Sequence, residues 1–205
     1  MTHKGPERVA KPIVFLLLSL PLVGMVTAGF MGELGANPVE KLTHETGEWA
    51  LRLLIAALAI TPLRKLTRLI WLARLRRMLG LYAFFYVSLH FLTYLWLDQF
   101  FDFDAIIEDI VKRPYITIGF TGVLVLIPLA VTSTNAMVKR LGGKRWQALH
   151  RLAYAAGILG CLHYLWLVKA DYTEPAIYSA VLAVLLLARL PWRRKKTSGG
   201  LYSAV

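Results

Sequence analysis

The sequence is poor in cysteine and in acidic residues, and it has no long polar stretch. Its 205 residues include one cysteine, Cys161, and 12 acidic residues against 24 basic ones. A single thiol within an apolar run excludes structural disulfides and cysteine-based metal or iron–sulfur sites inside one chain. There is no low-complexity tract and no insertion long enough for a second soluble domain. Residues 1–205 are therefore interpreted as a single domain.

Apolar residues, by contrast, are abundant. They make up 57% of the chain, and the mean hydropathy is +0.55. This composition is typical of a polytopic membrane protein rather than of a soluble domain. A membrane span needs about 20 mostly apolar residues. The sequence predicts an all-α bundle of six transmembrane helices, at residues 13–31, 47–63, 79–97, 115–133, 146–168 and 175–190.

The net charge of +12 is concentrated at alternate ends of these predicted spans. Basic residues precede the first span, fill the second and fourth connections, and follow the sixth span, where they occupy positions 193–196. Because cytoplasmic loops carry an excess of Lys and Arg, both termini are predicted to be cytoplasmic. The same rule accounts for the positive charge without a nucleic-acid partner. We expect the first apolar run to be retained, since no small-residue cleavage site follows it.

Three of the five histidines lie inside predicted spans. His90 is in the third span, and His150 and His163 are in the fifth. An ionisable side chain in hydrocarbon is costly unless something binds it, and a neutral imidazole is a common ligand of metals and of haem iron. We therefore interpret all three as candidate axial ligands of haem iron. Zinc is a weaker candidate because no Asp, Glu or Cys clusters with them at the usual spacings.

The depth of these histidines predicts an asymmetric arrangement. His90 and His163 lie in the outer halves of their spans, which predicts one haem between them near the outer face. His150 lies near the inner face, where the third span offers Arg76 and Arg77 instead of a histidine. Thirteen residues at 100° each leave His150 and His163 about 140° apart on an ideal helix. If both bind cofactors, the helix must deform or the cofactors must lie on different sides.

Other polar residues are weaker candidates. Arginine suits bidentate binding of oxyanions, so the inner-level arginines are candidates for holding haem propionates or a flavin phosphate. Ordinary positive-inside charge explains them equally well. The candidate cofactor-binding residues at this level are Arg76, Arg77, Trp146, His150 and Arg151.

The second span carries a polar face of its own. Its residues His44, Glu48 and Arg52 share one face at spacings of four. We expect an ion pair between Glu48 and Arg52. His44 is interpreted either as an interfacial polar residue or as a neighbour of a cofactor.

Three stretches carry a family resemblance: THETGEWALRLL, RRMLGLYAFFYVSLHFLTYLW and KRWQALHRLAYAAGILGCLHYLWLVKAD. With six spans, they resemble the ferric-reductase-like transmembrane superfamily. Over nearly the whole chain they resemble its MsrQ (YedZ) family, the haem-binding subunits of the bacterial periplasmic methionine sulfoxide reductase system. In the superfamily, His90 and His163 match the outer bis-histidine pair. His150 matches one half of the inner pair, whose other half is Arg76 or Arg77 here.

The resemblance implies an electron-transfer subunit in the bacterial inner membrane, without catalytic residues of its own. It implies one or two haem b groups and FMN as cofactors. The implied electron donor is quinol or a cytosolic flavin reductase. The implied acceptor is a periplasmic molybdopterin-containing reductase subunit that repairs methionine sulfoxide in proteins. The acidic stretch 98–109, with its phenylalanines, is a candidate docking surface for that subunit, and a solvated loop is the alternative.

Three other functions remain open at this level. One is a small transporter that uses histidines as a proton relay; against it, no span core contains an acidic partner and no inverted repeat is visible. A second is a ferric- or metalloreductase-type cytochrome with another acceptor. The third is an assembly or anchoring protein that binds no cofactor.

Overall fold

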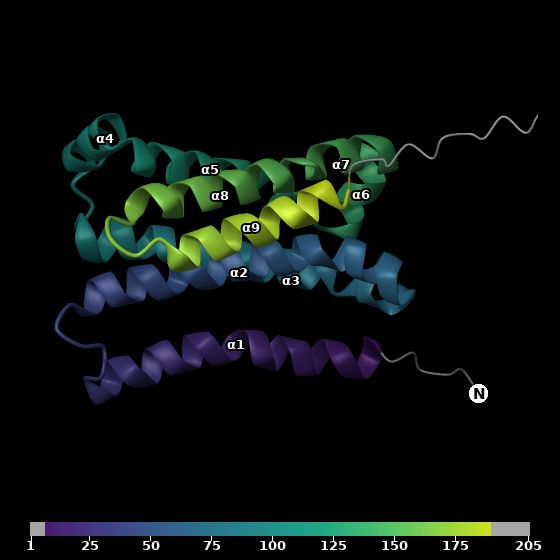
Figure 1. The fold of residues 1–205 in the computed structure, drawn as a ribbon, viewed down its shortest axis with the longest axis horizontal. Coiled ribbons are helices and arrows are strands. Elements are labelled where there is room, and N and C mark those ends of the chain that lie inside the picture. The colour runs from purple at the N-terminus through teal and green to yellow at the C-terminus, as the bar shows by residue number, and fades with distance from the viewer. Residues whose placement is uncertain (1–6, 190–205) are drawn as a thin grey trace, which may run out of the picture.

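The chain is described by a computed structural model that covers residues 7–189, with side chains from residue 9 (Figure 1). Within these residues the structure is all helical, which confirms the predicted fold class. The elements are α1 (Glu7–Met31), α2 (Pro38–Thr67), η1 (Ile70–Arg74), α3 (Arg76–Leu92), η2 (Thr93–Asp98), α4 (Phe103–Lys112), α5 (Pro114–Val131), α6 (Asn135–Leu141), α7 (Gly143–His150), α8 (Leu152–Leu167) and α9 (Thr173–Leu187). The predicted basic run 193–196 and the last residue of the sixth predicted span lie outside the described residues.

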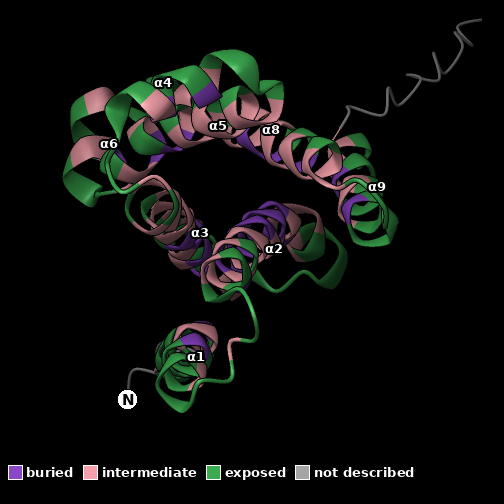
Figure 2. Cartoon of the chain, turned by 90° about the vertical axis from the view of Figure 1, so that its left-hand side faces the viewer, coloured by how far each residue is buried: buried purple, intermediate pink, exposed green. Residues whose placement is uncertain are grey.

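The core lies between α2 and the helices around it. Figure 2, seen from the end of the bundle that carries the α1–α2 connection, shows buried residues concentrated on α2 and α3. α2 begins after Asn37, whose side chain accepts a hydrogen bond from the Glu40 N–H at 3.2 Å. It ends at Arg68, which adopts a left-handed conformation with φ of 59°. α2 therefore continues past Pro62 and well beyond the predicted span 47–63.

α1 lies at the edge of the bundle and is exposed on most of its surface (Figure 2). Tyr86 on α3 binds the backbone of α1. The Tyr86 hydroxyl donates to the Leu18 carbonyl at 2.8 Å and accepts from the Leu22 N–H at 3.2 Å. The hydroxyl thus inserts between two groups that would pair with each other in a regular helix. Pro21, which has no N–H, lies beside this insertion. Burial of Tyr86 is complete, so the contact holds the register of α1 against α3.

Three segments of the described chain are long and apolar enough to cross a membrane: Val9–Met31, Ile70–Asp98 and Pro114–Val131. They correspond to the first, third and fourth predicted spans. α9 is apolar but shorter. α2 is longer than a span needs, but it carries charged residues near both ends. The count of six spans and the orientation of the termini therefore stay predictions.

The fifth predicted span, 146–168, is not one regular helix. α7 ends at His150 and α8 starts at Leu152, with Arg151 between them. The Arg151 N–H bonds to the Ala148 carbonyl at 3.2 Å, and the Tyr154 N–H bonds to the Arg151 carbonyl at 2.9 Å. These bonds span three residues instead of four, so the chain tightens by a turn of 3₁₀ type. The helix is therefore locally deformed next to His150, and the two histidines line different cavities.

Candidate functional site

Two histidines from distant parts of the chain face each other in the half of the bundle that the sequence predicts to be the outer one. His90 lies on α3 and His163 on α8, and their ring centres are 6.1 Å apart with ring planes at 77°. Both line one cavity of about 450 Å³ between α2, α3, α5 and α8. The structure therefore brings together the two residues that the sequence predicts as the outer pair.

Each imidazole is oriented by a backbone carbonyl of a neighbouring helix. The Nδ1 atom of His90 lies 2.8 Å from the Thr43 carbonyl oxygen on α2. The Nδ1 atom of His163 lies 2.7 Å from the Tyr115 carbonyl oxygen on α5. A carbonyl oxygen only accepts, so each Nδ1 carries the proton and each Nε2 keeps its lone pair. This second bond is the usual support of a metal-binding histidine.

Two glycines make room for these rings. Gly47 follows Thr43 by one helical turn, and Gly119 follows Tyr115 by one turn. A Cβ atom at Gly47 would lie 3.0 Å from Nδ1 of His90, and one at Gly119 would lie 2.7 Å from Nδ1 of His163. Any side chain at either position would thus meet an imidazole. Sequence reasoning missed both glycines, although each stands four residues after a carbonyl that holds a histidine.

The spacing of the two imidazoles suits a single metal ion between them. Metal–imidazole bonds are about 2 Å long, and the ring centre lies roughly one ångström beyond the nitrogen. Two imidazoles on opposite sides of one ion therefore have centres about 6 Å apart, close to the observed 6.1 Å. Across the described residues, no three His, Cys, Asp or Glu side chains come together to hold a metal ion. Of the residues that line this cavity, His90 and His163 are the ones whose rings lie at the spacing that one metal ion between two imidazoles requires.

A polar network borders the outer cavity. The predicted Glu48–Arg52 ion pair is confirmed, with 2.7 Å between Oε2 and Nη2. Nε of Arg52 donates to the Tyr178 hydroxyl at 2.7 Å, and the Tyr164 hydroxyl donates to Glu48 at 3.2 Å. Glu48 and His44 line the cavity itself. Glu48 and Arg52 therefore compensate each other's charge next to the cavity that contains the two histidines. They lie on the face of α2 that the sequence predicts to be polar.

A second cavity of about 510 Å³ lies in the other half of the bundle, which the sequence predicts to be the inner one. Every predicted inner-level residue lines it: Arg76, Arg77, Trp146, His150 and Arg151. Arg189 and Tyr154, which sequence reasoning missed, also line it, and Arg189 donates to the Tyr154 hydroxyl. No carboxylate is among the lining residues in the part of the chain that the structure describes. The inner cavity is therefore electropositive and suited to an anionic ligand.

His150 differs from the outer histidines. Its Nε2 atom lies 3.0 Å from the Thr132 hydroxyl, and the Trp146 ring stacks on it with centres 3.9 Å apart. The indole N–H of Trp146 donates to the Thr132 carbonyl at 2.8 Å, which fixes the stack. Among residues 7–189, no second histidine lines this cavity. The inner half therefore lacks the facing pair of imidazoles present in the outer half.

Comparison with known proteins gives one consistent result. Residues 46–161 match the family described as ferric reductase like transmembrane component. The chain is 52% identical to the "Protein-methionine-sulfoxide reductase heme-binding subunit MsrQ" of Herminiimonas arsenicoxydans, over 96% of this chain and 92% of that protein. It is 54% identical to the protein of the same name from Rhodospirillum rubrum, over 96% and 95%. It is 56% identical to the protein of that name from Xanthomonas campestris pv. campestris, over 78% of this chain and 73% of that protein. The chain belongs to the ferric reductase-like transmembrane family and, within it, to the MsrQ family.

Proposed function

We propose that this protein is the haem-binding membrane subunit of a methionine sulfoxide reductase system, with one haem b between His90 and His163. The observation that carries the proposal is the pair of facing imidazoles, 6.1 Å apart, whose Nδ1 atoms are both bonded to carbonyls. A haem held there supplies one-electron chemistry with a potential set by axial ligands, burial and nearby charge. The names of the relatives support haem as the group.

The residues around the outer cavity would hold and insulate this group. Thr43 and Tyr115 fix the imidazole tautomers through their carbonyls. Gly47 and Gly119 let the rings lie against α2 and α5. The cavity lining is mostly apolar, and the Glu48–Arg52 pair beside it adds little net charge. In this account the protein orients the ligands and controls the potential, and performs no bond chemistry.

We further propose that electrons cross the inner membrane from the cytoplasmic to the periplasmic side through six spans, with both termini in the cytoplasm. The donor would be quinol or a cytosolic flavin reductase. The acceptor would be a periplasmic molybdopterin-containing reductase subunit. Leu54 and Leu126 line both cavities, so only side chains separate carriers bound in the two halves. A proton relay is less well supported, because both outer Nδ1 atoms bond to backbone carbonyls instead of titratable groups.

Electron transfer across a bilayer tests this function. Purified protein is sealed into vesicles that contain ferricyanide, and dithionite is added outside. We expect wild-type protein and the His44→Ala variant to reduce the trapped ferricyanide, because His44 lines the cavity but is not one of the two paired imidazoles. With the His90→Ala variant, the rate of ferricyanide reduction should fall to the background rate of protein-free vesicles, because this variant lacks one of the two imidazoles that would hold the haem. Equal rates with and without His90 would contradict the proposal.

The inner cavity is the proposed site of a second anionic cofactor, either FMN or a second haem. Its phosphate or propionates would bind Arg76, Arg77 and Arg151, and its ring system would lie near Trp146 and His150. The support is the absence of any carboxylate among the lining residues. Arg77 already donates to the side-chain oxygen of Asn135 at 2.8 Å, so its guanidinium is held at the cavity.

Charge removal at the inner cavity tests this assignment. Hydrogen bonds to charged groups contribute about 1.5–3 kcal/mol, so Arg76→Gln should weaken binding of the inner cofactor roughly 10- to 100-fold. FMN and haem per protein are measured by extraction, with Lys139→Gln as a control because Lys139 is exposed on α6 and does not line the cavity. We expect the outer haem to be retained in both variants. An unchanged content of both cofactors in Arg76→Gln would refute the assignment.

A further inference from the structure

The short helix α4 presents three different faces. At 100° per residue, Ala105, Ile106, Asp109 and Ile110 share one side, Phe103, Ile107 and Val111 form a second stripe, and Asp104, Glu108 and Lys112 form a third. The first side is buried or half-buried and the other two are exposed. The second stripe is therefore apolar yet uncovered. Its side chains are 60–76% exposed.

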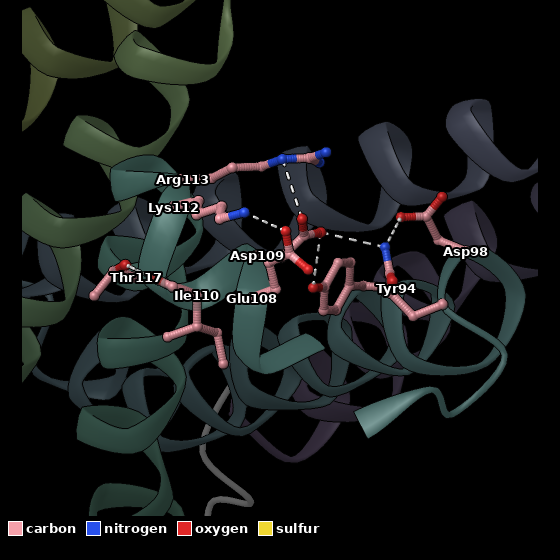
Figure 3. A network of polar contacts seen from close by, with 9 residues as sticks. Tyr94, Asp98, Glu108, Asp109, Ile110, Lys112, Arg113 and Thr117 are labelled. Carbon is pink, nitrogen blue, oxygen red and sulfur yellow. Dashed lines mark hydrogen bonds and ion pairs between the residues drawn. The ribbon is translucent and has the colours of Figure 1, made fainter. Parts of the chain in front are cut away.

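The buried side fixes the orientation of α4. Asp109 accepts hydrogen bonds from the Tyr94 hydroxyl and from the side-chain amide of Gln99, both at 3.3 Å, and pairs with Nε of Arg113 at 3.1 Å (Figure 3). The Thr117 hydroxyl donates to the Ile110 carbonyl (Figure 3). α4 is thus attached to η2 before it and to α5 after it. The helix cannot turn its apolar stripe inward without breaking this network.

Both ends of α4 are tethered to candidate membrane spans. Residues 99–102 connect it to the segment Ile70–Asp98, and Arg113 alone connects it to Pro114–Val131. Four residues reach at most ~14 Å when fully extended. α4 lies at the end of the bundle shared by the α1–α2 and α8–α9 connections (Figure 1). It must therefore stay at the level where the spans leave the membrane.

Aromatic side chains gather at this same end. Phe100 and Phe101 precede α4 with φ of 49° and 60°, a left-handed conformation that is strained for residues with a side chain. Phe100 is 80% exposed, so the strained turn presents its ring outward. Trp166 at the end of α8 and Tyr172 before α9 are also exposed. Exposed Trp and Tyr are typical of the membrane–water interface.

We infer that α4 and the Phe100–Phe101 turn form an interfacial anchor that lies in the outer lipid headgroup region. Phe103, Ile107 and Val111 face the acyl chains, while the stripe Asp104, Glu108 and Lys112 faces water. This is the arrangement of an amphipathic helix at a bilayer surface. The tether to two spans favours lipid over a soluble partner as the cover of the apolar stripe, because lipid is always present at that level. Asp104 and Glu108 remain available to the aqueous side, whereas Asp109 is buried in the network that holds the helix.

Depth measurement on adjacent positions tests the anchor. Ile107→Cys and Glu108→Cys differ by one residue but lie on different stripes, and each is labelled with a polarity-sensitive fluorophore. The wild-type protein gives the background, because its only cysteine, Cys161, is buried. In phosphatidylcholine vesicles we expect headgroup-nitroxide lipid to quench the label at 107 severalfold more than the label at 108. Iodide in the water should show the reverse order.

A second pair repeats the comparison one turn later, with Val111→Cys and Lys112→Cys. The anchor is overturned if iodide reaches both members of each pair equally. It is also overturned if the apolar positions become protected only when the periplasmic reductase subunit is added, since the cover would then be protein. None of these readings depends on haem.

Discussion

The His163→Ala variant is expected to lose the outer haem. His163 supplies one of the two facing imidazoles. The other histidines that line the cavity are His90, which is its partner, and His44 on α2. Loss of a supporting group around a metal ligand typically costs about 10- to 100-fold in affinity, so loss of the ligand itself should lower the haem-to-protein ratio at least about tenfold. Any haem that remains should be high-spin. His90→Ala should behave in the same way.

The control for this loss is another histidine at the same cavity. His44→Ala removes an imidazole that lines the cavity but is not part of the facing pair. Its haem content and low-spin spectrum should match those of the wild type. Retention of low-spin haem in His163→Ala, or an equal loss in His44→Ala, would contradict the assignment of ligands.

The Gly119→Ala variant is expected to lose haem although it changes no ligand. The added methyl group would lie 2.7 Å from Nδ1 of His163, well inside contact distance. The ring must then leave the Tyr115 carbonyl, which removes its orientation. Overpacking typically costs about 1–3 kcal/mol, which corresponds to a roughly 5- to 150-fold loss of haem affinity. Gly47→Ala, at 3.0 Å from His90, should have a smaller effect in the same direction.

Gly122→Ala provides the matched control, because Gly122 is also on α5 and lines the same cavity. The nearest atom to its added methyl group is Cβ of Leu159 at 3.8 Å, an ordinary contact. Alanine is favoured over glycine inside a helix by about 1 kcal/mol, so this variant should be neutral or slightly more stable. Haem content and thermal unfolding in detergent distinguish the two variants. Normal haem content in Gly119→Ala would show that the close approach has no role.

The outer histidine pair was accessible to sequence reasoning because histidine is rare in apolar segments and depth can be counted along a helix. The same counting placed Arg76, Arg77 and His150 at one level, and the structure brings them to one cavity. The two glycines were not accessible. A glycine in an apolar helix also serves ordinary packing, and only the contact between helices shows which histidine each one faces.

Local geometry accounts for the other differences. Nothing in residues 146–168 marks a break, since Arg151 is a good helix former, yet bonds of 3₁₀ type separate α7 from α8. Stretch 98–109 was predicted to be a docking surface or a solvated loop, but its residues 103–109 belong to α4. The sequence did contain a signal for the start of α4, because Asp is a favoured N-cap residue. In the structure the Asp102 side chain accepts hydrogen bonds from the N–H groups of Asp104 and Ala105. Its acidic composition concealed the apolar stripe.

The spectrum of the purified wild-type protein tests the central claim most directly. His90 and His163 would both hold the haem iron through imidazole nitrogens. We therefore expect low-spin haem, with Soret and α bands that shift on dithionite reduction and a low-spin electron paramagnetic resonance signal in the ferric state. A colourless protein that is correctly folded, or one whose haem is high-spin, would contradict a haem held between His90 and His163.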